Sequence, residues 1–295
     1  MDNMDHMEYG WKNTVRILIP ILAYAGITYL AEFVGTIIAM MFSVLAIKQG
    51  GGSIEYASMV DMIGQILTDY SYELSIAACV MALPVMLYFM HLDRKRLGDQ
   101  RKVYDQVPIA YYIPLLILGA AGCLALNNMV NLSGLAGNYQ ENLYQVQEAL
   151  YHGRILLELA GIGVLSPVVE EILFRGVVMN RIEETGSTKA AIILSAILFG
   201  CYHGNLLQAV YASMLGLILG YVYAKYRRLA APILVHVGAN IISVIGSETI
   251  WLDGMYQSDL YVMIFTAIWC VVILLCVYVV QYFVNPVELK KQDSL

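Results

Sequence analysis

The stretch Ser166–Val178 reads SPVVEEILFRGVV and lies in one of the most apolar parts of the chain. It nevertheless contains two adjacent carboxylates, Glu170 and Glu171, followed by Arg175. An ionised side chain at the centre of a membrane-spanning helix costs about 2.5–3.5 kcal/mol on insertion scales. A helix with three such residues must therefore face the interior of a helix bundle or a water-filled cavity, and this requirement guides the interpretation of the rest of the chain.

The overall composition indicates a multi-spanning membrane protein. Apolar residues make up 59% of the 295 residues and charged residues only 14%. The net charge of −6 argues against a nucleic-acid partner. The five cysteines lie in apolar segments without paired spacing, so no disulfide framework is expected. The acidic N-terminus lacks the basic region of a signal peptide, and we interpret the first apolar run as a retained span.

Hydropathy predicts an all-α fold of about eight transmembrane helices, with the active site buried in the bundle. Crossing the hydrocarbon core takes about 20 apolar residues. The predicted spans are approximately Val15–Ile47, Leu74–Leu92, Ile109–Val130, Ile155–Met179, Ala190–Tyr202, Leu207–Ala224, Leu229–Ile245 and Leu260–Phe283.

The charges of the connecting loops support this count and predict the orientation. Basic residues gather in residues 93–107, 180–189 and 225–228 and in the C-terminal tail. The alternate loops, residues 49–73, 131–153 and 246–259, carry acidic residues and neither Lys nor Arg. By the positive-inside rule, both termini should be cytoplasmic. The compact loops and the lack of targeting signals suggest an integral protein of the bacterial cell membrane.

Three polar clusters are predicted at membrane depth. They are Glu170, Glu171 and Arg175 in the fourth span, Phe199 and His203 in the fifth, and His236 and Asn240 in the seventh. Glu171 and Arg175 are four residues apart, a spacing that favours an ion pair. Glu170 points about 100° away from Glu171 and needs another partner. His203 is the expected partner, because the fourth and fifth spans form a hairpin that places both residues at similar depth.

These groups suggest hydrolytic chemistry. A carboxylate and an imidazole can hold and deprotonate a water molecule, and an imidazole and an amide N–H can donate to an oxyanion. Together they could hydrolyse an amide without a covalent intermediate. Taken singly, each feature has a structural explanation: the Glu171–Arg175 pair as a structural ion pair, His203 as an interhelical donor and Phe199 as packing.

The ordered motifs EExxxR (Glu170, Glu171, Arg175), FxxxH (Phe199, His203) and HxxxN (His236, Asn240) resemble those of the CPBP family. These proteins are intramembrane endopeptidases, also called CAAX-protease and bacteriocin-processing enzymes or Abi proteins. The resemblance implies that Glu170 and His203 activate water and that His236 and Asn240 form the oxyanion hole. Glu171, Arg175 and Phe199 would support the site.

The resemblance also implies an arrangement of the chain within one integral membrane domain. Residues 1–153 would form N-terminal transmembrane helices, residues 154–247 the catalytic core, and residues 248–295 the last helix and tail. The expected function is hydrolysis of a peptide bond in a membrane-associated or lipidated, CAAX-like polypeptide. The expected partners are this substrate and the lipid bilayer, and the oligomeric state stays open.

Two alternative functions remain at this point. One is a non-enzymatic membrane protein that binds a peptide in the same cavity, for bacteriocin self-immunity or as a scaffold. The other is a proton-coupled transporter, since buried Glu, His and Arg can relay protons. The absence of a visible internal repeat counts against a transporter.

A metal site is a further alternative, because the family is often classed as metalloproteases. Glu170, His203 and His236 could supply the carboxylate and two imidazoles of a catalytic zinc site. The sequence lacks HExxH, however, and a metal that used both histidines would remove a donor from the oxyanion hole. We therefore favour a mechanism without a cofactor and keep Zn²⁺ as the alternative.

Overall fold

The structure is a computed structural model that describes residues 3–49, 56–98, 103–104, 107–133, 154–248, 258–284 and 288–289. It is that of an all-α membrane protein, as predicted. Six described helices are long and apolar enough to cross a membrane. These six are α1 (Asn3–Gln49), α3 (Ser71–Leu97), α4 (Ile113–Leu132), α10 (Leu206–Tyr226), α11 (Ala230–Glu248) and α12 (Asp259–Phe283).

The fourth and fifth predicted spans are also helical, but they differ from ordinary spanning helices. The fifth is α9 (Thr188–Tyr202), which has only 15 residues. The fourth is part of an unbroken helical run made of α6 (Ile155–Glu158), η3 (Leu159–Leu165), α7 (Ser166–Glu171), η4 (Ile172–Met179) and α8 (Asn180–Thr185). The predicted count of eight is therefore approximate.

The fourth span is irregular around its carboxylates. The segments η3 and η4 are π-helical and flank α7, which carries Pro167 in its first turn. Proline lacks the N–H that an α-helix needs four residues after a carbonyl, so the helix before it must adjust. Directly before this proline, the helix widens into the π-helical η3 and does not end. Single π-helical turns often lie at functional sites.

The segment between the first two spans contains an additional helix, where the sequence analysis expected a loop. This helix, α2 (Tyr56–Asp69), buries Ile66 and packs against α1. The acidic charges of residues 49–73 indicated a loop, whereas Met59, Ile63 and Ile66 have the spacing of one helix face. The predicted boundary at residue 153 lies outside the described residues.

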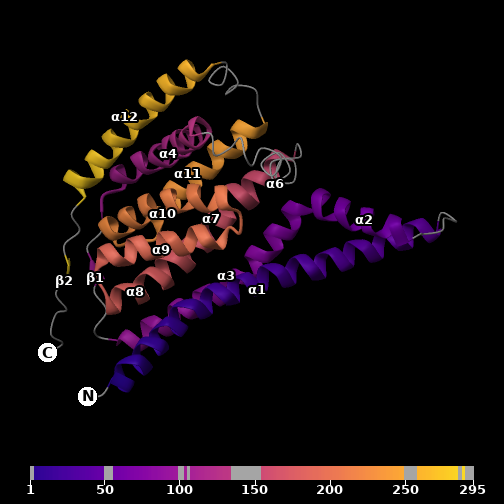
Figure 1. Cartoon of the computed structure of the whole chain (residues 1–295), viewed down its shortest axis with the longest axis horizontal. Helices are drawn as coiled ribbons and strands as arrows, with labels where there is room; N and C mark the ends of the chain where they lie inside the picture. The colour runs from indigo at the N-terminus through magenta and orange to yellow at the C-terminus, as the bar shows by residue number, and fades with distance from the viewer. Residues whose placement is uncertain are drawn as a thin grey trace.

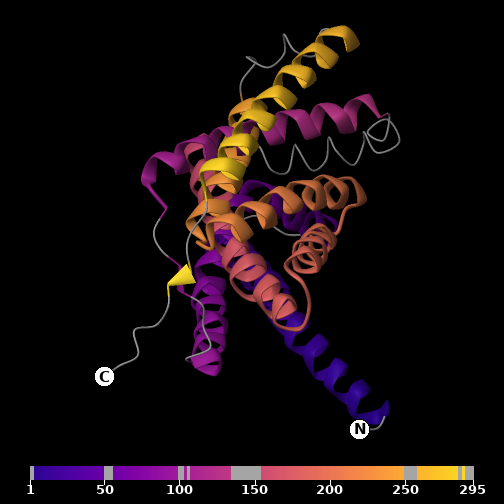
Figure 2. The same cartoon turned by 90° about the vertical axis from the view of Figure 1, so that its left-hand side faces the viewer.

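The core of the bundle lies between two outer groups of helices. In Figure 1, α7 to α11 occupy the middle, α4 and α12 lie along one side, and α1 and α3 along the other. Helix α12 crosses the outer side of α4 (Figure 2). The short η2 (Ile109–Tyr112) leads into α4, and β1 (Val103–Tyr104) pairs antiparallel with β2 (Glu288–Leu289).

The start of α1 and the strand β2 lie toward the same end of the molecule (Figure 1). An even number of crossings requires this arrangement, with both ends of the described chain on one side. The cytoplasmic assignment of this end stays a prediction from loop charge.

Charged residues at this end connect the N-terminal helices to the core. Arg181 of α8 pairs with Asp93 of α3 at 2.7 Å and also donates to the backbone carbonyl of Arg16 in α1. Arg16 in turn pairs with Glu184 at 3.4 Å, and Arg96 of α3 pairs with the same carboxylate. Because three separate elements share these charges, the network sets the position of α1 and α3 against α8.

Helices α4 and α11 pack closely through glycine. A Cβ atom on Gly119 would lie 1.8 Å from the carbonyl oxygen of Val235, and one on Gly238 would lie 2.4 Å from that of Leu116. Such distances leave no room for a side chain. The close approach holds α11, which carries two of the predicted site residues, against α4.

We therefore expect Gly119→Ala to destabilise the protein, because the added methyl group must push α11 away from α4. Overpacking of this kind costs about 1–3 kcal/mol. The measurement is the midpoint of thermal unfolding of the purified protein in detergent.

The matched control is Gly26→Ala in α1, where no atom lies within 4 Å of the added carbon. This change should leave the midpoint unchanged or raise it slightly, because alanine favours helix. Equal midpoints for Gly119→Ala and Gly26→Ala would contradict the close α4–α11 contact.

Candidate active site

A buried ion pair lies at the centre of the bundle. Arg175 Nη1 donates to Glu171 Oε1 at 2.8 Å, and both side chains have zero solvent exposure. The second terminal nitrogen, Nη2, donates to the carbonyl oxygen of Gly216 in α10 at 3.0 Å. The ion pair predicted from the four-residue spacing is confirmed, and it also links the fourth span to α10.

The same carboxylate oxygen also contacts a histidine from a different helix. His236 of α11 is buried, and its Nδ1 lies 2.9 Å from Glu171 Oε1. An ionised carboxylate can only accept, so Nδ1 carries the hydrogen in this contact. The other ring nitrogen, Nε2, is left to face the neighbouring carboxylate.

That neighbour is Glu170, which contacts two groups. Ser166 Oγ donates to Glu170 Oε1 at 2.6 Å. Glu170 Oε2 lies 3.8 Å from His236 Nε2. This second distance exceeds that of a direct hydrogen bond and suits two groups that share a water molecule. Glu170 thus has one oxygen fixed by the protein and the other facing an imidazole.

The predicted pairing of Glu170 with His203 is not present in the structure. The ring of His203 bonds to its own helix: Nδ1 lies 2.8 Å from the carbonyl oxygen of Phe199. His203 follows the last residue of α9, where the free carbonyls of the helix end are available to its ring. The imidazole beside Glu170 is that of His236.

Phe199 brings the two histidines into one site. Its ring makes edge-on contacts with His203, at a centroid distance of 4.9 Å, and with His236, at 5.5 Å. The guanidinium of Arg175 lies 4.9 Å from the same ring, in the geometry of a cation–π contact. Phe199 therefore does more than pack in the core, because its ring separates the two imidazoles and covers the ion pair.

Asn240, one turn after His236 in α11, is held by the fourth span. Its amide nitrogen donates to the carbonyl oxygen of Ile162 at 2.8 Å. An amide has two N–H donors, so the second is available for another acceptor. Ile162 lies in the π-helical η3, and its carbonyl oxygen has two lone pairs, so it can accept from Asn240 in addition to a bond within its own helix.

Three further groups, which were not predicted, hold these residues. Ser166 stands four residues before Glu170, the same spacing that revealed the Glu171–Arg175 pair, so this signal was present. No sequence pattern predicts the carbonyl oxygens of Ile162 and Gly216 as acceptors, because every residue has a backbone carbonyl. Gly216 and Gly220 of α10, spaced as GxxxG, pack closely against Ala196 and Ile192 of α9.

The residues do not form a ready metal centre. Within the described ranges, no three His, Cys, Asp or Glu side chains lie close enough together to hold a metal ion. Of the proposed zinc ligands, Glu170 and His236 face one another, whereas His203 contacts its own helix. The arrangement of these three side chains therefore does not fit a three-ligand zinc site.

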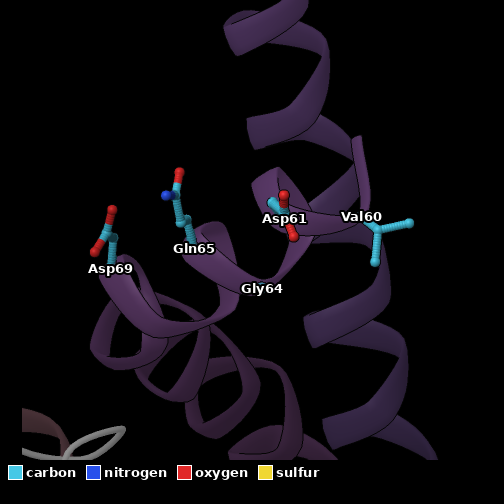
Figure 3. Close-up of a pocket in the computed structure, with 5 residues that line it drawn as sticks. All are labelled: Val60, Asp61, Gly64, Gln65 and Asp69. Carbon is cyan, nitrogen blue, oxygen red and sulfur yellow. The ribbon is translucent and has the colours of Figure 1, made fainter. Parts of the chain in front are cut away.

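The structure also has an open hollow of about 560 Å³ on α2, far from these groups in the sequence. Figure 3 shows Asp61, Gln65 and Asp69 on one side of α2 and Val60 pointing to the other. The hollow contains none of the predicted site residues. It is therefore not the candidate active site.

Comparison with known proteins relates the segment that carries the buried cluster to a peptidase family. Residues 152–242 match the model of a family described as type II CAAX prenyl endopeptidase, Rce1-like. This segment contains all the predicted site residues. The chain is also 23% identical over 175 residues to the candidate membrane peptidase YdiL of Bacillus subtilis (strain 168), an alignment that covers 58% of this chain and 69% of that protein. No solved structure gives a significant match.

The buried ion pair generates a stability prediction. We expect Arg175→Met to lower the free energy of unfolding by about 3–5 kcal/mol, because it leaves the Glu171 carboxylate buried without its counter-ion. Adding Glu171→Gln should recover part of the loss by removing that charge. The midpoint of thermal unfolding in detergent reports both effects.

Arg227→Met is the matched control. Arg227 pairs with Glu183 at 2.8 Å, but both side chains are partly exposed. Partly exposed pairs contribute at most about 1 kcal/mol. Similar losses for Arg175→Met and Arg227→Met would contradict the argument from burial.

Proposed function

We propose that this chain, which carries an Rce1-like domain of the CPBP family over residues 152–242, hydrolyses a peptide bond of a membrane-associated or lipidated polypeptide. The family is that of a CAAX-type intramembrane peptidase, which implies a polypeptide substrate and a membrane context. The observation that carries the proposal is the buried chain of contacts from Arg175 through Glu171 and His236 to Glu170.

Glu170 is the proposed general base. With Oε1 held by Ser166, Oε2 is left to accept a proton from a water molecule. The resulting hydroxide bonds to the carbonyl carbon of the scissile peptide, and its carbonyl oxygen becomes an oxyanion. The carbon–nitrogen bond then breaks, and Glu170 passes its proton to the leaving nitrogen. No covalent bond to the protein forms.

His236 and Asn240 are the proposed oxyanion donors. Asn240 would use the N–H that Ile162 leaves available. His236 uses its Nδ1–H in the hydrogen bond to Glu171. It can therefore donate to an oxyanion only when Nε2 carries a hydrogen as well. Glu171 suits this role, because its carboxylate accepts from Nδ1 and so holds the ring with Nε2 towards Glu170.

His203 is the proposed second contact of the attacking water. A hydrogen on Nδ1 directed to the Phe199 carbonyl leaves Nε2 as an acceptor for a water hydrogen. The 3.8 Å gap between His236 Nε2 and Glu170 Oε2 supports a variant of this mechanism, in which His236 shares the water with Glu170 instead. The variants His203→Asn and His236→Asn distinguish these two mechanisms. Only loss of the histidine that contacts the water should lower cleavage as much as loss of Glu170 does.

The central prediction concerns Glu170→Gln, which keeps the shape of the side chain and removes the base. We expect cleavage to fall at least about 100-fold while the protein still folds, because general-base catalysis contributes about 10²–10⁴. The measurement is a comparison of protein termini by mass spectrometry in cells that express either form at equal levels. New termini specific to the wild type would also name the substrate.

Glu32→Gln is the control, because Glu32 is a glutamate of α1 outside the site. It should produce the same termini as the wild type. A Glu170→Gln protein that produced them too would contradict hydrolysis at this site and favour a peptide-binding role.

The proposed mechanism uses no metal, and this generates a separate prediction. Purified protein should retain its activity after treatment with a chelator, and elemental analysis should find no stoichiometric zinc. Stoichiometric zinc that is lost together with activity would contradict the metal-free mechanism. Restoration of activity by added zinc after chelation would contradict it as well.

A further inference from the structure

The buried cluster is closed towards the end of the bundle that carries the ionic network of Arg181. All eight residues of η4, which follow Glu171 in the fourth span, are buried. Phe174 and Met179 have no exposed surface at all. Because protein interiors are packed as densely as organic crystals, this layer leaves no path for a polypeptide. Substrate therefore does not reach Glu170 from the network end.

Towards its other end, the fourth span becomes accessible. Ser166, which donates to Glu170, is half-buried. Val164, two residues earlier in η3, is 42% exposed, and only the two glycines of η3 are buried. This direction leads to α6, which lies at the far end of the molecule from α8 (Figure 1). The cluster is therefore closer to open surface in the direction of α6 than in that of α8.

Helix α11 has a polar face that runs in the same direction. Spacings of four, three and four residues place these side chains on one face: His236, Asn240, Ser243 and Ser247. His236 is buried, the next two are half-buried and Ser247 is exposed. Three residues before His236, towards the start of the helix, the chain has the apolar Ile233. Polar side chains at membrane depth face the bundle interior or water, and this face ends at an exposed serine.

The turn between α9 and α10 forms the third side of the cluster. His203 is half-buried, and Gly204, with a φ of +67°, is exposed. Non-helical backbone in a membrane protein must be covered by protein or face water, so the exposed glycine indicates contact with water. Beside the turn, the ring of Tyr202 stacks on that of Tyr24 in α1, at a centroid distance of 5.1 Å and an interplanar angle of 25°. This stack joins α1 to α9 and closes the side between them.

We propose that the active site opens towards the end of the bundle opposite the ionic network, between η3, the α9–α10 turn and the polar face of α11. Loop charge assigns the network end to the cytoplasm, so the opening faces the outer side of the membrane. The substrate is then a membrane-associated polypeptide segment presented from the outer side. A cytoplasmic tail would meet the closed layer of η4 instead. The identity of the substrate rests on the proposed function, whereas the direction of the opening does not.

The polar face of α11 suits an extended polypeptide. Each peptide unit has an N–H and a C=O group that need partners away from water. A serine hydroxyl can both donate and accept, so Ser243 and Ser247 match both groups. His236 and Asn240, the proposed oxyanion donors, are the innermost residues of the same face. A chain that enters along α11 therefore meets hydroxyl groups first and the catalytic groups last.

Thiol labelling from each side of the membrane tests the direction of the opening without a substrate. The parent protein is full-length Cys201→Ser, which removes the exposed native thiol. A charged, membrane-impermeant methanethiosulfonate is added outside intact cells or to inverted vesicles, and labelling of the parent is subtracted. We expect Ser243→Cys to react from the outside only. Lys95→Cys, at the exposed end of α3 beside the ionic network, should react from the inside only.

Val271→Cys is the matched control within a span. Val271 is 55% exposed and lies among apolar residues in the middle of α12, so it faces lipid. Only the thiolate reacts, and it does not form in apolar surroundings, so Ser243→Cys should react at least about tenfold faster from the outside. Reaction of Ser243→Cys from the inside, from neither side, or no faster than Val271→Cys overturns the proposal. Reaction of Ser243→Cys and Lys95→Cys from the same side overturns it as well.

Cleavage gives the second readout, measured as the rate at which wild-type-specific termini form. Labelling of Ser243→Cys from the outside should stop cleavage relative to the same variant before labelling, whereas the reagent should not affect Val271→Cys. The new termini should lie in segments on the outer side. Termini confined to cytoplasmic segments, or cleavage that survives complete labelling, would overturn the proposal. If the wild type forms no termini, the proposed function fails, and thiol labelling still tests the opening.

Discussion

The carboxylate of Glu171 has no contact with solvent and lies where three parts of the bundle meet. One of its oxygens accepts from Arg175 in its own helix and from His236 in α11, and Arg175 also reaches a carbonyl of α10. A charge at membrane depth without such partners costs several kcal/mol. If the helices separated, Glu171 would lose these partners and this free-energy cost would apply. The buried charge therefore fixes the relative positions of the helices.

The same constraint creates the geometry of the proposed catalytic groups. Adjacent residues of a helix point about 100° apart, so fixing Glu171 towards Arg175 directs Glu170 to a different neighbour. Glu171 also binds His236 through Nδ1, which turns Nε2 towards Glu170. Structural and chemical roles are thus divided between two consecutive carboxylates, one paired within the protein and one left with an oxygen for water.

The irregular backbone of the fourth span helps to hold the groups around these two carboxylates. The carbonyl oxygen of Ile162, in the π-helical η3, accepts from Asn240 and so ties the fourth span to α11. Outside that span, α1 contributes the buried Tyr24, whose ring stacks on Tyr202 of α9. Elements from outside and within the family segment are thus packed together, and the ionic network at Arg181 keeps the two parts in register.

The sequence alone determined the fold class, the approximate positions of the spans and the set of polar residues at membrane depth, because hydropathy and the cost of buried charge act on each helix separately. It also determined the Glu171–Arg175 pair, since four-residue spacing is local to one helix. It did not reveal that His236 rather than His203 lies beside Glu170, or that Tyr24 of α1 stacks on Tyr202 of α9. Those contacts join helices distant in the chain, and their partners depend on crossing angles and depths that only the packing of the whole bundle sets.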